Sequence, residues 1–153
     1  MLSKDYAAAL AFDYCLLAIK PIQHAPFPFY KTGDFNLLAV GDEVYTNGYT
    51  NGNVQSFVSR GIVASKSVDT TVSVTNNGKV VQMPRSEALL NLTQYRSGGA
   101  IIKMGATVYD DELVGIANFI TLPNGKALEN AGPSPIGGCI AINHFLDGLT
   151  RMK

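Results

Sequence analysis

The chain has 153 residues, about the length of one domain, with 46% apolar and 16% charged residues. Twelve basic residues balance twelve acidic ones. This composition excludes a disordered chain and supplies no basic excess for electrostatic binding of nucleic acid. Because a low content of charge leaves little repulsion between copies, self-association is expected.

The two cysteines, Cys15 and Cys139, lie far apart in the sequence. A small disulfide-stabilised domain uses more cysteines than this. A structural zinc site needs clustered Cys and His, and His24 and His144 are the only histidines. We therefore predict buried thiols and no metal or other cofactor.

The longest apolar run covers residues 6–19 and contains Asp13. It is shorter than the roughly 20 residues that a membrane-spanning helix needs. The residues around it do not form a basic start and a small-residue cleavage site, as a signal peptide would. We expect neither a membrane span nor a signal peptide.

Most of the chain consists of short apolar or alternating runs separated by turn residues. Strands are predicted at residues 16–19, 37–40, 43–45, 54–68, 70–74, 79–83, 88–92, 100–104, 113–122 and 139–142. The clearest hairpin joins the fifth and sixth of these through Asn76-Asn77-Gly78. Strands at a spacing of about 8–12 residues indicate a sandwich or barrel.

Other local features complete the prediction. Asn47-Gly48 and Asn51-Gly52 are typical turn dipeptides. Gly61 suggests a bulge or bend within its strand. The proline-rich segment 22–31 is expected to be a surface loop. Residues 143–152 carry a helical apolar stripe, and residues 3–10 are a second helix candidate with Ser3 as its N-cap.

Five short motifs follow one another in an order that resembles the second β-barrel of trypsin-like serine peptidases, particularly the HtrA-like branch. They are Gly41-Asp42-Glu43-Val44-Tyr45, Ser59-Arg60-Gly61-Ile62-Val63-Ala64, Ser97-Gly98-Gly99-Ala100, Leu113-Val114-Gly115-Ile116 and Gly137-Gly138-Cys139-Ile140-Ala141-Ile142. Upstream, residues 13–19 are similar to the segment that carries the catalytic aspartate in this family. The resemblance covers roughly residues 13–149.

The resemblance implies an all-β fold: an antiparallel, six-stranded Greek-key barrel of trypsin-like type with a C-terminal helix. Residues 37–153 would form this second barrel. Residues 1–36 would be an N-terminal segment and crossover, the end of a first barrel that is mostly missing from the chain.

The resemblance also implies an acyl-enzyme peptidase chemistry. Ser97 would be the nucleophile, placed on a tight turn by the two glycines that follow it, and Asp13 would be the carboxylate that orients a histidine base. Substrate-binding positions implied by the family are Tyr95, Arg96, Asn91, Ile116, Ala117, Asn118 and Gly138. The strand around residues 115–118 would pair with the substrate backbone.

Two positions depart from the family pattern. The family's histidine precedes the aspartate by tens of residues, whereas the twelve residues before Asp13 contain no histidine. Tyr95 stands where the family has the glycine that donates one oxyanion-hole N–H, and losing one such donor costs roughly 10²–10³ in rate. We therefore expect the isolated chain to hydrolyse peptides poorly or not at all.

Two functions remain open from the sequence. One is a trypsin-like serine endopeptidase in which a separate chain or domain supplies the histidine. The other is a catalytically inactive relative that acts as a structural or binding module, for example in a viral assembly. The expected partner is a polypeptide, either as substrate or as bound protein. A second copy of the chain or a chain supplying the first barrel would cover the side of the barrel that the missing first barrel leaves exposed.

Asp110-Asp111-Glu112 lacks the spaced ligands of a calcium loop and is expected to be a solvated turn.

Overall fold

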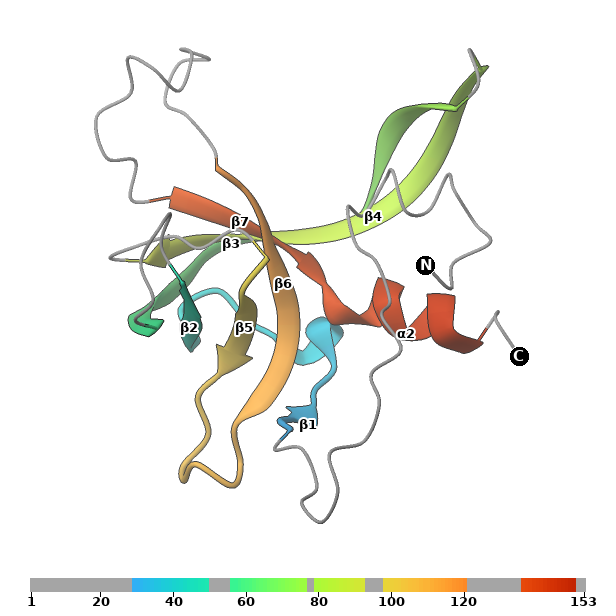
Figure 1. The fold of residues 1–153 in the computed structure, drawn as a ribbon. Helices are drawn as coiled ribbons and strands as arrows, with labels where there is room; N and C mark the ends of the chain where they lie inside the picture. Colours follow the sequence, from blue (N-terminus) through green and yellow to red (C-terminus); the bar gives the residue numbers. More distant parts are fainter. Residues whose placement is uncertain (1–28, 50–55, 77–78, 93–97, 121–135, 151–153) are drawn as a thin grey trace.

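The computed structural model describes residues 29–49, 56–76, 79–92, 98–120 and 136–150. These residues form one sheet of seven strands, followed by a helix (Figure 1). The strands are β1 (Lys31–Thr32), β2 (Glu43–Tyr49), β3 (Ser56–Asn76), β4 (Lys79–Leu92), β5 (Ala100–Lys103), β6 (Glu112–Ile120) and β7 (Ile136–Ala141). A short 3-10 helix, η1 (Phe35–Leu37), follows β1, and α2 (Ile142–Thr150) follows β7. No helix in these ranges is long and apolar enough to cross a membrane.

The sheet closes on itself. Its strand order is β1-β6-β5-β2-β3-β4-β7, and β6 also pairs with β7. Strands β2 to β7 therefore form a ring in which every pairing is antiparallel. After the β2–β3–β4 meander the chain crosses to β5 beside β2, which is a Greek-key connection. The predicted six-stranded antiparallel barrel with a C-terminal helix is confirmed.

The barrel is filled by side chains that alternate along the strands. On β4, residues 86, 88, 90 and 92 are buried, while the residues between them are partly or fully exposed. This period of two is the pattern that a strand with one face in the core requires. The core cluster consists of Phe35, Leu38, Val44, Val63, Ala88, Leu90, Leu92, Ile101, Val114, Ala117, Cys139 and Ala141. Full burial of a side chain such as Leu90 contributes about 1.5–3 kcal/mol.

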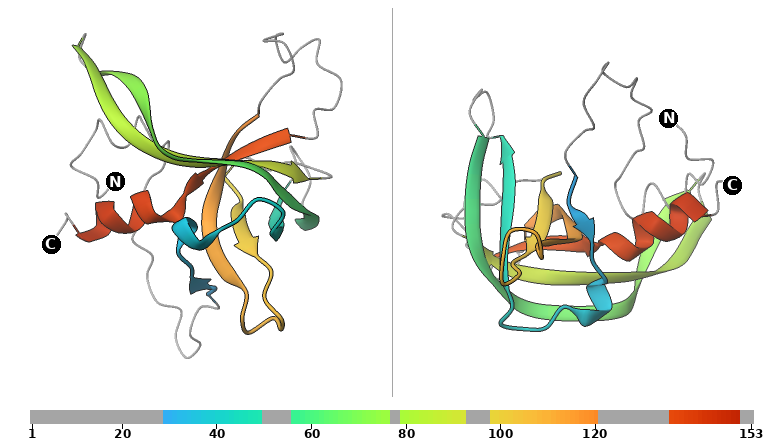
Figure 2. Two further views of the ribbon diagram at one scale, coloured as in Figure 1. Left: turned by 180° about the vertical axis from the view of Figure 1, so that it is seen from behind. Right: turned by 90° about the horizontal axis from the view of Figure 1, so that it is seen from below.

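Beyond the barrel, β3 and β4 continue as a two-stranded ribbon that projects past the start of α2 (Figures 1 and 2). The register runs from Thr70 opposite Arg85 to Asn76 opposite Lys79. The predicted hairpin is thus confirmed, although its strands are the outer halves of two long strands.

The predicted C-terminal helix is confirmed by α2, and the second helix candidate, residues 3–10, lies outside the described ranges.

Three local predictions were wrong. Asn47-Gly48 is not a turn, because Asn47 pairs with both Val58 and Ala100 inside β2. The pairing of two neighbouring strands outweighs the turn preference of the dipeptide. Residues 37–40 are not a strand: η1 ends at Leu37, and a turn follows at Val40-Gly41. Of the bulge or bend predicted at Gly61, the bulge is wrong, because Gly61 lies in register opposite Leu92. The register of β3 with β4 shifts between Val63 and Ser65 and between Ser67 and Thr70.

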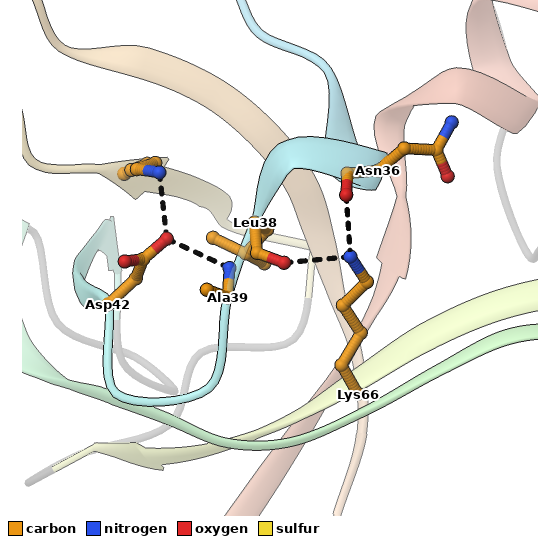
Figure 3. A network of polar contacts seen from close by, with 6 residues as sticks. Asn36, Leu38, Ala39, Asp42 and Lys66 are labelled. Carbon is orange, nitrogen blue, oxygen red and sulfur yellow. Dashed lines mark hydrogen bonds and ion pairs between the residues drawn. The ribbon is translucent and has the colours of Figure 1, made fainter.

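The segment between β1 and β2 is held against the barrel by charged groups. The ammonium of Lys66 on β3 donates to the carbonyl oxygens of Asn36 at 2.8 Å and Leu38 at 2.7 Å (Figure 3). It also lies 5.5 Å from the ring centroid of Phe35, a cation–π distance. Phe35 is fully buried, so Lys66 secures the loop at the point where it contributes a side chain to the core.

A second contact fixes the same segment to α2. The Asn143 side chain accepts a hydrogen bond from the Phe35 N–H at 2.9 Å and donates to Asp34 at 2.9 Å. The first of these joins residues 108 positions apart. The segment between β1 and β2 and the C-terminal helix therefore meet on one side of the barrel, as Figure 2 also shows.

Gly61 gives a test of the barrel's close strand packing. A Cβ at this position would lie 1.7 Å from the Asn91 carbonyl oxygen. We expect Gly61→Ala to lower the free energy of unfolding by about 1–3 kcal/mol, because the strands must move apart to admit the methyl group. Urea unfolding followed by circular dichroism measures this. Ser65→Ala, at an exposed position of the same strand, is the control, and equal stability of both variants would contradict the close approach.

The carboxyl group of Asp42 makes the stability of the fold depend on pH. Partial burial by itself would raise the pKa of this carboxyl, but the Lys103 ammonium at 2.7 Å and the Ala39 N–H at 2.9 Å outweigh it and lower the pKa below its ordinary value. The stabilisation is present above the unfolded pKa of about 3.9 and is lost as the pH falls through the lower folded value. We expect the wild type to lose stability more steeply than Asp42→Asn between about pH 5 and pH 2.

The measurement is urea unfolding at several pH values across that window. Asp147→Asn, which removes an exposed carboxylate on α2, is the matched control and should follow the wild-type profile. Parallel profiles for the wild type and Asp42→Asn would show that the carboxylate contacts do not contribute.

Candidate functional site

Several predicted site residues lie at one rim of the barrel. Because neighbouring strands are antiparallel, the ends of β4 and β6 share this rim with the starts of β5 and β7. The predicted substrate-binding residues on these ends are Asn91, Ile116, Ala117, Asn118 and Gly138. The barrel therefore gathers positions separated by 47 residues in sequence, from 91 to 138, at one place.

The described ranges begin again at Gly98, directly after the predicted nucleophile. Ser97, Asp13, Tyr95 and Arg96 lie outside them, and their roles stay predictions. Cys15 and His24 also lie outside the described residues.

Gly98 enters the rim in a conformation that favours glycine. Its φ is +79°, in the left-handed region, and a side chain there would be strained. Its N–H donates to the Ala117 carbonyl at 2.6 Å, and the Ala117 N–H donates to the Gly99 carbonyl at 2.8 Å. These bonds extend the β5–β6 pairing by one residue pair. They tie the residue that follows Ser97 to the strand predicted to bind substrate.

The same bonds limit where a substrate strand can pair. Both backbone polar groups of Ala117 are used by the two glycines. Ile116 lies between Ala100 on β5 and Ile140 on β7. These two residues therefore have sheet neighbours on both sides, and pairing with substrate along β6 stays a prediction for the residues from Asn118 onward. Asn118 stands at the register shift between Ala117 and Phe119, where the strand departs from regular pairing.

His144 is the one histidine within the described ranges. It lies on α2, which follows the far end of β7, so it stands at the opposite rim from Gly98. Its Nε2 accepts the backbone N–H of Ser86 at 2.7 Å, and accepting requires that this nitrogen carry no proton. This contact with β4 gives His144 a structural role on α2, away from the Gly98 rim.

Cys139 on β7 is fully buried and free, as the sequence predicted for it. Burial raises the pKa of its thiol to about 12, so the thiolate that nucleophilic or metal-binding chemistry needs is not formed near neutral pH. Within the described ranges, no group of three or more His, Cys, Asp or Glu side chains gathers as a metal site would require.

The acidic run at residues 110–112 is only partly the solvated turn that the sequence predicts: Asp110 is exposed in the turn, but Asp111 is not. Asp111 is only 8% exposed. Its carboxylate accepts the Tyr45 hydroxyl at 2.8 Å and the Gly105 N–H at 2.9 Å. Burial, followed by the influence of Tyr30 and Asp111, raises the pKa of Tyr45. The sequence could not indicate this pairing, because Tyr45 and Asp111 are 66 positions apart.

Comparison with known proteins supports the fold of the chain. No family model and no curated protein sequence matches the chain. Among solved structures, the HtrA-type protease AlgW, described with a decapeptide, matches with a TM-score of 0.53 and 18% identity. The match covers 82% of this chain and 33% of AlgW, so the chain spans about a third of that protein's length. The closed antiparallel ring and this likeness together give the chain a trypsin-like β-barrel fold.

Proposed function

We propose that the chain is the second barrel of a trypsin-like serine endopeptidase, with Ser97 at the nucleophile position and with little activity as an isolated chain. The observation that carries this proposal is the pairing of Gly98 and Gly99 with Ala117. It supports a Ser-Gly-Gly turn at the rim of the barrel, at the start of β5, where the resemblance expects the nucleophile. The peptide named with AlgW supports a polypeptide as the ligand.

The proposed reaction is acyl transfer. The Ser97 Oγ forms a bond to the scissile carbonyl carbon, a base accepts the hydroxyl proton, and that proton passes to the leaving amine as the C–N bond breaks. Water then attacks the acyl-enzyme in the same way and releases the acid. The described residues supply no base, because His144 is at the other rim and its Nε2 is already bonded to Ser86.

A second barrel of this kind needs a partner to complete it. We infer that residues 37–153 are the second barrel and residues 1–36 the end of a first one, and that another chain or domain supplies the histidine. In that arrangement Asp13 orients the base, while Asn91 and Gly138 line the first specificity pocket and Tyr95, Arg96 and the end of β6 contact the substrate backbone. The small size of Gly138 and its burial on β7 fit a pocket wall.

The second candidate is a catalytically inactive member of the fold that binds polypeptide or builds an assembly. The position of His144 and the tyrosine at position 95 favour it. Both candidates share the same rim, so they differ in whether Ser97 reacts and not in where the polypeptide binds.

Covalent labelling of Ser97 separates the two. We expect a fluorophosphonate probe to leave the isolated chain unlabelled. Without a general base, the reaction of the Ser97 hydroxyl with the probe loses an acceleration of about 10²–10⁴-fold. The native assembly, purified from its source, is tested beside it, and Ser97→Ala is the control for site specificity. Ser97-dependent labelling of the assembly alone supports the peptidase, and no labelling of either supports the inactive module.

Stoichiometric labelling of the isolated chain that is lost in Ser97→Ala would show that a base exists within these 153 residues. His24→Ala and His144→Ala variants would then identify it. Loss of labelling in His144→Ala alone, with an unchanged circular dichroism spectrum, would contradict the structural role given to that residue.

Association is the second expected property. Val58 and Ile62 lie on the same face of β3 and are 68% and 43% exposed, so the outside of the barrel presents apolar surface that an interface would cover. We propose a homo-oligomer or a complex with a first-barrel chain. Multi-angle light scattering of the purified chain should give more than one subunit at high concentration, and Val58→Asp should shift the population toward monomer. A monomer at every concentration would leave the heteromeric partner as the form to isolate and would contradict the homo-oligomer.

A further inference from the structure

A cavity lies at the barrel end opposite the Gly98 rim. It is open to solvent, has a volume of about 480 Å³ and is lined by Phe29, Tyr30, Lys31, Thr32, Val108, Tyr109 and Asp111. Its walls come from residues 29–32, which include β1, and from the β5–β6 connection. In Figure 1, β1 and this connection both lie at the lower end of the barrel. This volume is in the range of about 300–1,000 Å³ typical of ligand-binding pockets.

The walls are apolar and open to solvent. Phe29 and Tyr109 are each 90% exposed, and Val108 is 76% exposed. Three large apolar side chains around one cavity form an exposed patch of the kind that marks a binding site. Two of the three are aromatic, and Tyr30 adds a third ring that meets Tyr45 edge to face with centroids 6.3 Å apart.

The connection that carries Tyr109 is held by hydrogen bonds. The Asp110 carboxylate accepts the Thr107 hydroxyl at 2.8 Å and the Thr107 N–H at 3.2 Å. The Asp110 N–H donates to the Thr107 carbonyl at 2.9 Å. The Gly105 N–H donates to the Asp111 carboxylate at 2.9 Å. The two residues at the tip are therefore presented on a fixed turn, which lowers the entropy cost of binding a ligand there.

The charge around the cavity is negative. Asp111 lines it, and Asp110 is next to it in the turn. The cation of Lys31 is paired with Glu112 at 2.8 Å, so it is offset by a carboxylate of its own. Lys31, the one cation among the lining residues, also interacts electrostatically with Asp110. The three carboxylates of Asp110, Asp111 and Glu112 outnumber it, so the region beside the aromatic rings carries a net negative charge. A bound cation would be stabilised by Coulomb attraction to the carboxylates and by cation–π contact with the faces of the aromatic rings.

From these features we propose that this cavity binds an arginine side chain of a partner polypeptide. A guanidinium is planar, stacks on aromatic rings, and is more weakly hydrated than an ammonium, so it suits walls made of Phe29, Tyr30 and Tyr109. The cavity is larger than one guanidinium, which leaves room for the aliphatic part of the side chain. This site is separate from the proposed nucleophile rim and does not depend on Ser97.

The chain contains no tryptophan, so a single Tyr109→Trp substitution places one fluorescent indole at the cavity. The folded variant is titrated with the peptide acetyl-Gly-Arg-Gly-amide and with its citrulline counterpart, which is nearly isosteric and uncharged. We expect saturable changes in emission and at least tenfold tighter binding of the arginine peptide. Calorimetry on the wild-type chain with the same two peptides checks that the indole does not create the site.

Phe29→Ala in the Tyr109→Trp background should weaken binding of the arginine peptide about fivefold or more, because it removes one ring. Leu37→Ala, at an apolar position that is 74% exposed elsewhere, is the matched control and should change nothing. Raising the salt concentration should weaken arginine binding and leave citrulline binding unchanged.

Equal affinity for the arginine and citrulline peptides would overturn the proposal, and so would the absence of saturation by either. An emission change that follows protein concentration without peptide would also overturn it, since the cavity would then be a contact between copies. The titration reports on the cavity alone, so its failure leaves the labelling of Ser97 unaffected, and failure of that labelling leaves this result unaffected.

Discussion

The pairing of β6 with β7 is the constraint on which the rest of the structure depends. Without it the sheet would end at β7, and the outer edge of that strand would be open. The register of the pair runs from Gly115 opposite Ala141 to Ile120 opposite Gly137. Because β7 is bonded to β4 as well, it has no unpaired edge in the barrel, and closure of this kind removes an edge that could pair with another chain. Closure also encloses Cys139 and Ala141 in the core.

Closure gives the two ends of the barrel different characters. At one rim the starts of β5 and β7 meet the ends of β4 and β6, and backbone groups of Gly98 and Gly99 bond to Ala117. At the other, the chain from β1 and the β5–β6 connection bring aromatic and acidic side chains together. We propose that an extended polypeptide backbone pairs at the first rim from Asn118 onward and that a side chain binds at the second.

The sequence predicted the parts of the fold that depend on local pattern. The alternation on each side of residues 76–78 indicated the hairpin, and the spacing of strands with ordered glycine motifs indicated the barrel. It failed where distant pairing decides the conformation. Asn47-Gly48 has the preference of a turn, but strands on both sides bond to Asn47. Likewise Asp111 is buried where Tyr45, from another strand, donates to it.

The candidate site was predictable to the same extent. The resemblance to trypsin-like peptidases implies that Asn91, Gly138 and residues 116–117 share one binding site, and the strand pairings bring these positions to one rim. The sequence could not tell which backbone groups of β6 are already used, because that depends on the register of β5. The aromatic cavity left no motif, since Phe29 and Tyr109 are 80 residues apart in sequence and meet only through the β1–β6 pairing.

Strands β5 and β6 run between the two ends of the barrel. The pairing of these strands determines whether binding at one end can change the structure at the other. They are paired from Ala100 opposite Ile116 to Lys103 opposite Glu112. The one irregularity in this pairing is the register shift between Ile101 and Ile102, and both of these side chains are fully buried. A packed interior opposes sliding of one strand along the other, because any shift would open voids or overlap side chains. Occupation of the aromatic cavity should therefore leave the Gly98 contact in place, so the two ends are expected to bind their ligands independently.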